Sequence, residues 1–180
     1  MTNNNNNPAN DVPKMDRNSA EFRQWNRLAD GMDRFHNAFR AEYADVYRKA
    51  TAKFKGDSFK YFIREAEMLA IHLGNHHRIE EAYIFPMLAP KLPQFGQNTP
   101  QSASHITAHR GIHDGLEKYS AYLNAAKRDP DSYDGNELRK IMESFHDVLF
   151  NHLDEEVRDL GAESVRKAGF TLQELNRFPL

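Results

Sequence analysis

Apolar residues recur at intervals of three and four along most of this chain, which is the periodicity of helices that bury one face. Four long stretches carry this pattern, over residues 19–53, 58–88, 99–128 and 136–160. No stretch shows the strict alternation that marks a half-buried strand. We therefore predict an all-α protein, and an up-down four-helix bundle is the simplest packing for four helices of this length.

Local signals mark the ends of these helices. Ser58 suits the N-cap of the second helix, and Thr99 followed by Pro100 suits the start of the third. Gly161 suits the C-cap of the fourth. Gly31 is expected to kink or split the first.

The two ends of the chain differ from its central part in composition and in the structure that we expect. Residues 1–18 are polar and rich in Asn, so we expect a disordered tail that buries no apolar surface. Residues 19–180 are long and apolar enough for one domain with one core. Within that domain, residues 161–180 are expected to form a short helical cap, with a turn or two around residues 171–176.

Composition excludes several classes of function. The net charge is −2, so there is no basic surface for nucleic acid or for an anionic membrane. The chain has no cysteine, which excludes disulfides, thiolate metal sites and cysteine nucleophiles. No apolar run approaches the roughly 18 residues that span a bilayer, and the N-terminus lacks the apolar core of a secretory signal. We expect a cytoplasmic protein with no nucleic-acid or membrane partner.

Five of the nine histidines and two glutamates fall into one pattern over the four helices. Partners on the same helix are spaced four apart, which places them about 40° apart around the axis and about 6 Å apart along it. Buried without metal, two carboxylates and five imidazoles would each need another partner. The pattern therefore predicts metal ligands, and these are His36, His76, Glu80, His109, His113, His152 and Glu156.

The second helix offers the same spacing twice, at His76/Glu80 and at His77/Glu81. Leu73, on the apolar stripe, lies within roughly 60° of His76, whereas Glu81 lies about 140° from His76. We therefore expect His76 and Glu80 to point inward, His77 to sit at the edge of the inward face, and Glu81 to face water.

Other polar residues flank the predicted ligands. His72 and His105 each lie one turn before a predicted ligand, and Tyr83 lies one helix face away. Together with His77, these residues are expected to be hydrogen-bond partners of the ligands or pocket residues rather than ligands.

The ligand types narrow the choice of metal. Imidazole and carboxylate without thiolate suit Fe, Mn, Zn or Cu. Two six-coordinate ions need twelve bonds, and five imidazoles, two bridging carboxylates and an oxo or hydroxo bridge supply eleven. One position stays open, and on a pair of irons it would suit O2.

These residues make the chain similar to the hemerythrin family, specifically its histidine/glutamate-rich hemerythrin-like (HHE) branch. The resemblance covers roughly residues 28–160 and rests on His36, the segment 76–88, His109-x-x-x-His113, and His152-Leu153-Asp154-Glu155-Glu156. It implies a four-helix bundle with two iron ions rather than zinc or manganese. The five histidines would be terminal ligands, and Glu80 and Glu156 would bridge. The last carboxylate is Glu four residues after its histidine, whereas oxygen-carrying hemerythrins have Asp five residues after theirs. That spacing is similar to the enzyme, sensor and iron-handling members.

Three functions stay open at this point. The first is a non-haem di-iron protein that binds O2 or a related small molecule in O2, redox or iron handling or sensing. The second is a di-iron oxidase or oxygenase acting on a small organic substrate beside the metal, which a cavity there would favour. The third is a helical interaction module that is metal-free or holds zinc. No nucleotide, flavin or nicotinamide motif is present, so electrons would come from another protein or from the substrate. The pattern specifies no catalytic side chain and no oligomeric state.

Overall fold

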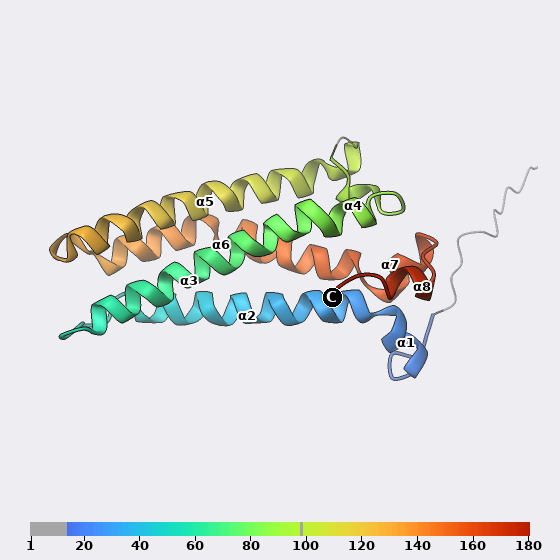
Figure 1. Cartoon of the computed structure of the whole chain (residues 1–180), viewed down its shortest axis with the longest axis horizontal. Coiled ribbons are helices and arrows are strands. Elements are labelled where there is room, and N and C mark those ends of the chain that lie inside the picture. Colours follow the sequence, from blue (N-terminus) through green and yellow to red (C-terminus); the bar gives the residue numbers. More distant parts are fainter. Residues whose placement is uncertain (1–13, 98) are drawn as a thin grey trace, which may run out of the picture.

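Four long helices lie side by side and form the body of the protein (Figure 1). The computed structural model describes residues 14–97 and 99–180, and this part of the chain contains helices and no strand. The long helices are α2 (Arg27–Lys49), α3 (Ser58–Ile79), α5 (Ala103–Arg128) and α6 (Gly135–Asp159). Helices α2 and α5 each contact both α3 and α6. The predicted all-α class is confirmed.

Shorter helices connect and close this body. α1 (Ala20–Trp25) precedes α2, and α3 continues through the π-helix η2 (Glu80–Ile84) into α4 (Phe85–Leu88). The 3-10 turns are η3 (Pro93–Phe95), η4 (Pro100–Ser102) and η5 (Pro130–Ser132), and the chain ends with α7 (Ala162–Lys167) and α8 (Leu172–Leu175). Over the described residues, no helix combines the length and the apolarity that crossing a membrane requires.

The first predicted helix is interrupted, although not at Gly31. The break falls at Asn26, whose side chain donates to Asp30 and accepts a hydrogen bond from the backbone N–H of Ala162. Gly31 has another role, because a Cβ there would lie 3.0 Å from Leu180. The missing side chain therefore allows the C-terminal residue to pack against α2.

The structure confirms one of the predicted capping residues and differs from the prediction at two others. Thr99 accepts a hydrogen bond from the N–H of Ser102 and caps η4, as expected. Ser58 is instead the first residue of α3, and its hydroxyl accepts from the N–H of Lys55. The prediction for Gly161 is wrong, because its φ of −63° and its bond from Val165 make it the N-cap of α7.

Two apolar clusters fill the interior. The larger lies between the long helices and includes Phe39, Leu73, Ile112, Leu149 and Leu153. The smaller lies towards the end of the molecule that carries α4, α7 and α8 (Figure 1), and it includes Met32, Ile84, Leu160, Phe170 and Phe178. Residues 161–180 thus close one end of the helices with buried side chains. The disorder predicted for residues 1–18 lies, for residues 1–13, outside the described part of the chain.

Candidate metal centre

A layer of buried polar side chains separates the two apolar clusters. On α2 it lies between Met32 and Phe39, and on α6 between Leu149 and Leu160. Side chains from α2, α3, η2, α5 and α6 enter it. The members that are at most 5% exposed are His36, His77, Glu80, His109, His152 and Glu156.

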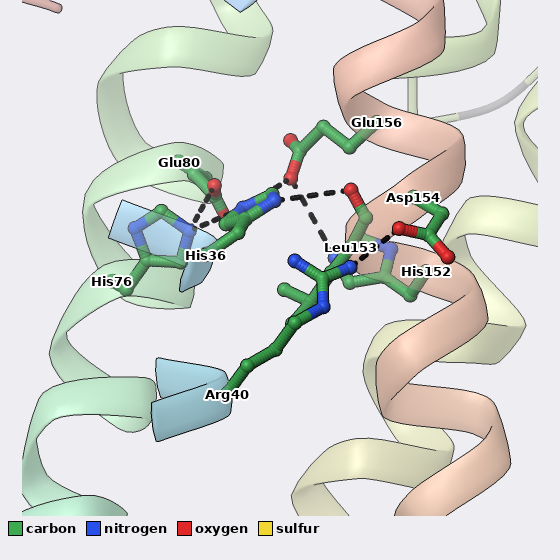
Figure 2. A network of polar contacts seen from close by, with 8 residues as sticks. All are labelled: His36, Arg40, His76, Glu80, His152, Leu153, Asp154 and Glu156. Carbon is green, nitrogen blue, oxygen red and sulfur yellow. Dashed lines mark hydrogen bonds and ion pairs between the residues drawn. The ribbon is translucent and has the colours of Figure 1, made fainter. Parts of the chain in front are cut away.

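One half of the layer gathers around His36 (Figure 2). The Nδ1 atom of His36 lies 3.0 Å from the carbonyl oxygen of Leu153. Because a carbonyl only accepts, Nδ1 carries a proton, and in the neutral ring Nε2 has a lone pair. That Nε2 lies 3.1 Å from Nε2 of His76 and 3.4 Å from a carboxylate oxygen of Glu156. His76 Nε2 in turn lies 2.7 Å from Oε1 of Glu80.

The other half lies towards α5. The rings of His77 and His109 have centroids 4.5 Å apart, and the centroid of His152 lies 4.6 Å from that of His109. His109 Nδ1 donates to Oε1 of Glu81 at 2.7 Å, so its Nε2 is free to face the layer. An anionic partner of this kind fixes the tautomer and the orientation of a metal-binding imidazole.

Glu80 connects the two halves. Ligand atoms of His36, His76, Glu80 and Glu156 lie within 4.8 Å of one another, and so do those of His77, Glu80, His109 and His152. Since Glu80 belongs to both groups, its carboxylate lies within reach of the ligand atoms of both.

The expectation that His77 lies at the edge of the inward face is wrong, because its side chain is 0% exposed. The reason is that α3 contacts two helices, α2 and α5. Consecutive residues of a helix point about 100° apart, so His76 faces His36 on α2 while His77 faces His109 on α5. Glu80 lies between these directions. Both histidines therefore take part in the layer, on two sides of Glu80.

His113 belongs to neither group, although its ring centroid lies 5.7 Å from that of His77. Its side chain is 50% exposed, and its Nε2 is 3.7 Å from the carboxylate of Glu81. Glu81, His109 and His113 form a separate, more exposed trio of ligand-type residues. The buried stripe of α5 runs through Ile112 and Leu116, and His113 projects well to one side of it. Its role as an iron ligand stays a prediction.

The remaining candidates divide between the surface and the site. His72 binds Glu42 at 2.9 Å in a part-buried contact on the side of the helices, and Tyr83 is 66% exposed. Neither belongs to the buried layer. His105 does border it, because its ring lies 4.9 Å from that of His152 and its buried Nε2 has no hydrogen-bond partner.

The π-helix η2 begins at Glu80, where the N–H of Phe85 bonds to the carbonyl of Glu80. Such single π turns occur often at functional sites. Here the wider turn begins with the two glutamates, and within it Glu80 is buried, Glu81 reaches His109 from outside, and Ile84 enters the smaller apolar cluster. Sequence periodicity at a fixed 100° per residue contains no signal for this turn.

Burial controls the protonation of the layer. It lowers the pKa of His77 and of His152 well below the usual value, and neighbouring imidazoles lower both further. It also raises the pKa of Glu80, to which the charge of Glu156 adds. Burial opposes ionisation of Glu156 as well, yet its contact with His36 holds the pKa of Glu156 below its usual range. The imidazoles of His77 and His152 are therefore held in the neutral form, which is the form that binds metal.

The buried polar atoms of this layer fit a metal better than they fit each other. Buried polar groups nearly always have a hydrogen-bond partner. Nevertheless, buried atoms without a well-directed hydrogen bond gather here: both ring nitrogens of His77 and His152, Nε2 of His109, and both oxygens of Glu80 and Glu156, although one Glu80 oxygen lies 2.7 Å from His76 Nε2. Cations held here would satisfy one nitrogen of each imidazole together with the carboxylate oxygens.

A cleft of about 810 Å³ opens beside the His109 half of the layer. Its walls include Phe85, Phe95 and Ile106, together with the polar side chains of His105 and Arg110. This volume lies in the range of sites for small organic ligands.

Comparison with known proteins agrees with this geometry. The chain is 29% identical over 130 residues to the dimeric xanthone biosynthesis cluster protein R11 of Cryptosporiopsis sp. (strain 8999). The match covers 72% of this chain and 47% of that protein, so the chain spans about half the length of this relative. No solved structure matches the chain. The model of the hemerythrin HHE cation binding domain matches residues 27–162, and the chain therefore belongs to the hemerythrin HHE family of cation-binding domains.

Proposed function

We propose that this chain holds two iron ions in the buried layer and uses them to oxidise a small organic substrate with O2. His36 and His76 would hold one ion, and His77, His109 and His152 the other. Glu80, with Glu156 beside it, would lie between them. We interpret the four long helices as an up-down four-helix bundle of the hemerythrin type, in which each helix contributes at least one ligand.

Iron is the metal that this donor set and this chemistry favour together. Imidazole and carboxylate also suit zinc and manganese. Two irons, when bound, supply the binding and reduction of O2 that no side chain of the chain provides. The apolar clusters on either side of the layer exclude water from it. The Leu153 carbonyl and the Glu81 carboxylate orient His36 and His109.

The cleft is the observation that favours an enzyme over a simple O2 carrier. A site for O2 alone needs only a small apolar pocket, whereas this cleft has room for an organic molecule and carries polar side chains beside the ligand His109. The relative from Cryptosporiopsis is named for a cluster that makes dimeric xanthones. That name supports an organic molecule as the substrate here, without identifying it.

Binding of O2 without an organic substrate, in O2, redox or iron handling or sensing, is the second candidate. It is supported by the complete burial of His36, Glu80 and Glu156. A site closed to that degree suits a ligand as small as O2.

Metal analysis combined with optical spectroscopy tests the proposal. We expect two irons per chain and, on admission of air to the reduced protein, O2 uptake that an organic substrate accelerates. A reversible absorption band with no consumption of O2 would favour the second candidate. A protein without transition metal, whose folding is unaffected by chelator, would refute both.

A further inference from the structure

The cleft beside His109 has a polarity that indicates what it binds. Its inner wall is formed by Phe85 and Phe95, which are 8% and 2% exposed and have ring centroids 5.3 Å apart. Ile106, which is 38% exposed, forms part of the wall nearer the solvent. Walls of aromatic and aliphatic side chains suit a mainly apolar molecule.

The two charged side chains that line the cleft differ in whether they already have a partner. The carboxylate of Glu81 accepts a hydrogen bond from His109 and lies 3.7 Å from His113, so its charge is already engaged. Arg110 also lines the cleft, and within residues 14–97 and 99–180 it has no hydrogen bond or ion pair. Over the described residues, Arg110 is therefore the one charged side chain of the cleft without a hydrogen-bond or ion-pair partner.

A free guanidinium at the edge of an apolar cleft recognises one kind of group. Its planar fork matches an anionic oxygen, above all a carboxylate. We propose that the cleft binds the organic substrate of this protein, and that this substrate is a mainly apolar molecule with one anionic oxygen, a carboxylate or a phenolate, which pairs with Arg110. This inference rests on the proposed function, because it names the substrate class of the same site.

The position of the cleft determines how a bound molecule would be oriented relative to the metal ligands. His105 and His109 line it, and His105 also contacts His152 inside the layer. A molecule held by Arg110 at the outer edge would extend its apolar part over His105 towards the metal ligands. Arg110 is thus a positioning residue, and the half-buried His105 separates the bound molecule from the buried layer.

Calorimetric titration of the iron-loaded protein tests the proposal with two isosteric probes, 2-naphthoate and 2-naphthamide. We expect the carboxylate to bind more tightly than the amide. Arg110→Gln should weaken 2-naphthoate on the order of fivefold, the effect of about 1 kcal/mol for a partly exposed charged hydrogen bond. The same variant should leave 2-naphthamide unchanged. Ile106→Glu, which places an anion in the wall, should weaken both probes.

A matched control exists on another cleft. Arg64 is an exposed arginine in a second cleft, of about 520 Å³, lined by Phe59 and Ile63. Arg64→Gln should not change the binding of either probe. If Arg64→Gln weakens 2-naphthoate as much as Arg110→Gln does, or if the two probes bind equally to every variant, the proposal is overturned.

A second arm distinguishes the two sources of the anion. 2-Naphthol is titrated at neutral pH and near pH 10, where a phenol is about half ionised. If 2-naphthol binds more tightly when it is ionised, and Arg110→Gln abolishes this gain, the anionic group is a phenolate. If only 2-naphthoate binds more tightly than its neutral analogue, the group is a carboxylate. If neither anion binds more tightly than its neutral form, the proposal is overturned. If the protein holds two irons per chain and binds no probe, ligand binding in the cleft is refuted while the proposed metal centre is not. Probe binding without any O2 uptake would refute the proposed oxidation alone.

Discussion

Substitution of His77 by alanine tests whether the second group of ligands is the one that the structure assembles. His77 is 0% exposed, and its ring lies 4.5 Å from that of His109 and 5.6 Å from that of His152. Sequence periodicity alone assigns this residue to the edge of the helix face, where alanine would have little effect. The tertiary structure predicts that His77→Ala releases one of two metal ions and leaves the ion at His36 and His76 in place.

The expected loss of stability follows from burial. Truncating a large, fully buried side chain to alanine costs about 3 kcal/mol through lost contacts and the cavity that remains. In a chain of this size, 1 kcal/mol lowers Tm by about 2–4 °C, so His77→Ala should lower Tm by roughly 6–12 °C. His113 is half exposed, so His113→Ala should change stability by no more than about 0.5 kcal/mol.

Both quantities are measured on the same purified samples, metal per chain by emission spectrometry and Tm by circular dichroism. His146→Ala is the matched control, because His146 is an exposed histidine on α6 that binds Asp147 outside the layer. If His113→Ala loses a metal ion while His77→Ala retains two, then the second ligand group is wrong and the spacing His109-x-x-x-His113 describes the site.

Three further outcomes are expected. Glu80→Gln removes the charge shared by both ligand groups, so both ions should be lost while the helical circular dichroism is retained; a variant that keeps two ions would exclude the bridging position. Glu81→Gln removes the anionic partner of His109, so metal affinity should fall about 10–100-fold in a chelator competition, and an unchanged affinity would contradict that role. Burial lowers the pKa of His76 and of His105 from 6.5 to about 4. Between these values the unfolded chain binds protons that the folded chain does not, so the metal-free protein should lose stability as the pH falls through this window. A urea midpoint that stays level or rises from pH 7 towards pH 5 would contradict this sign.

The sequence determined much of this protein through local chemistry. The 3.6-residue period of its apolar residues identified the four long helices, because each helix must bury one face whatever its neighbours are. The same period placed His36, Glu80, His109 and Glu156 on buried faces, since a polar residue within an apolar stripe enters the core with it. The ligand types, imidazole and carboxylate without thiolate, limited the metals before any contact was known.

Tertiary structure decided which of the adjacent ligand-type residues meet. The width of the inward face of α3 depends on how α2 and α5 lie against it, and this width is what admits His76 and His77 together. The π turn at Glu80 and the cleft beside His109 likewise depend on packing between α3, α5 and the connection that joins them. A helical period describes one helix at a time, whereas a two-metal site is a property of the space between several helices.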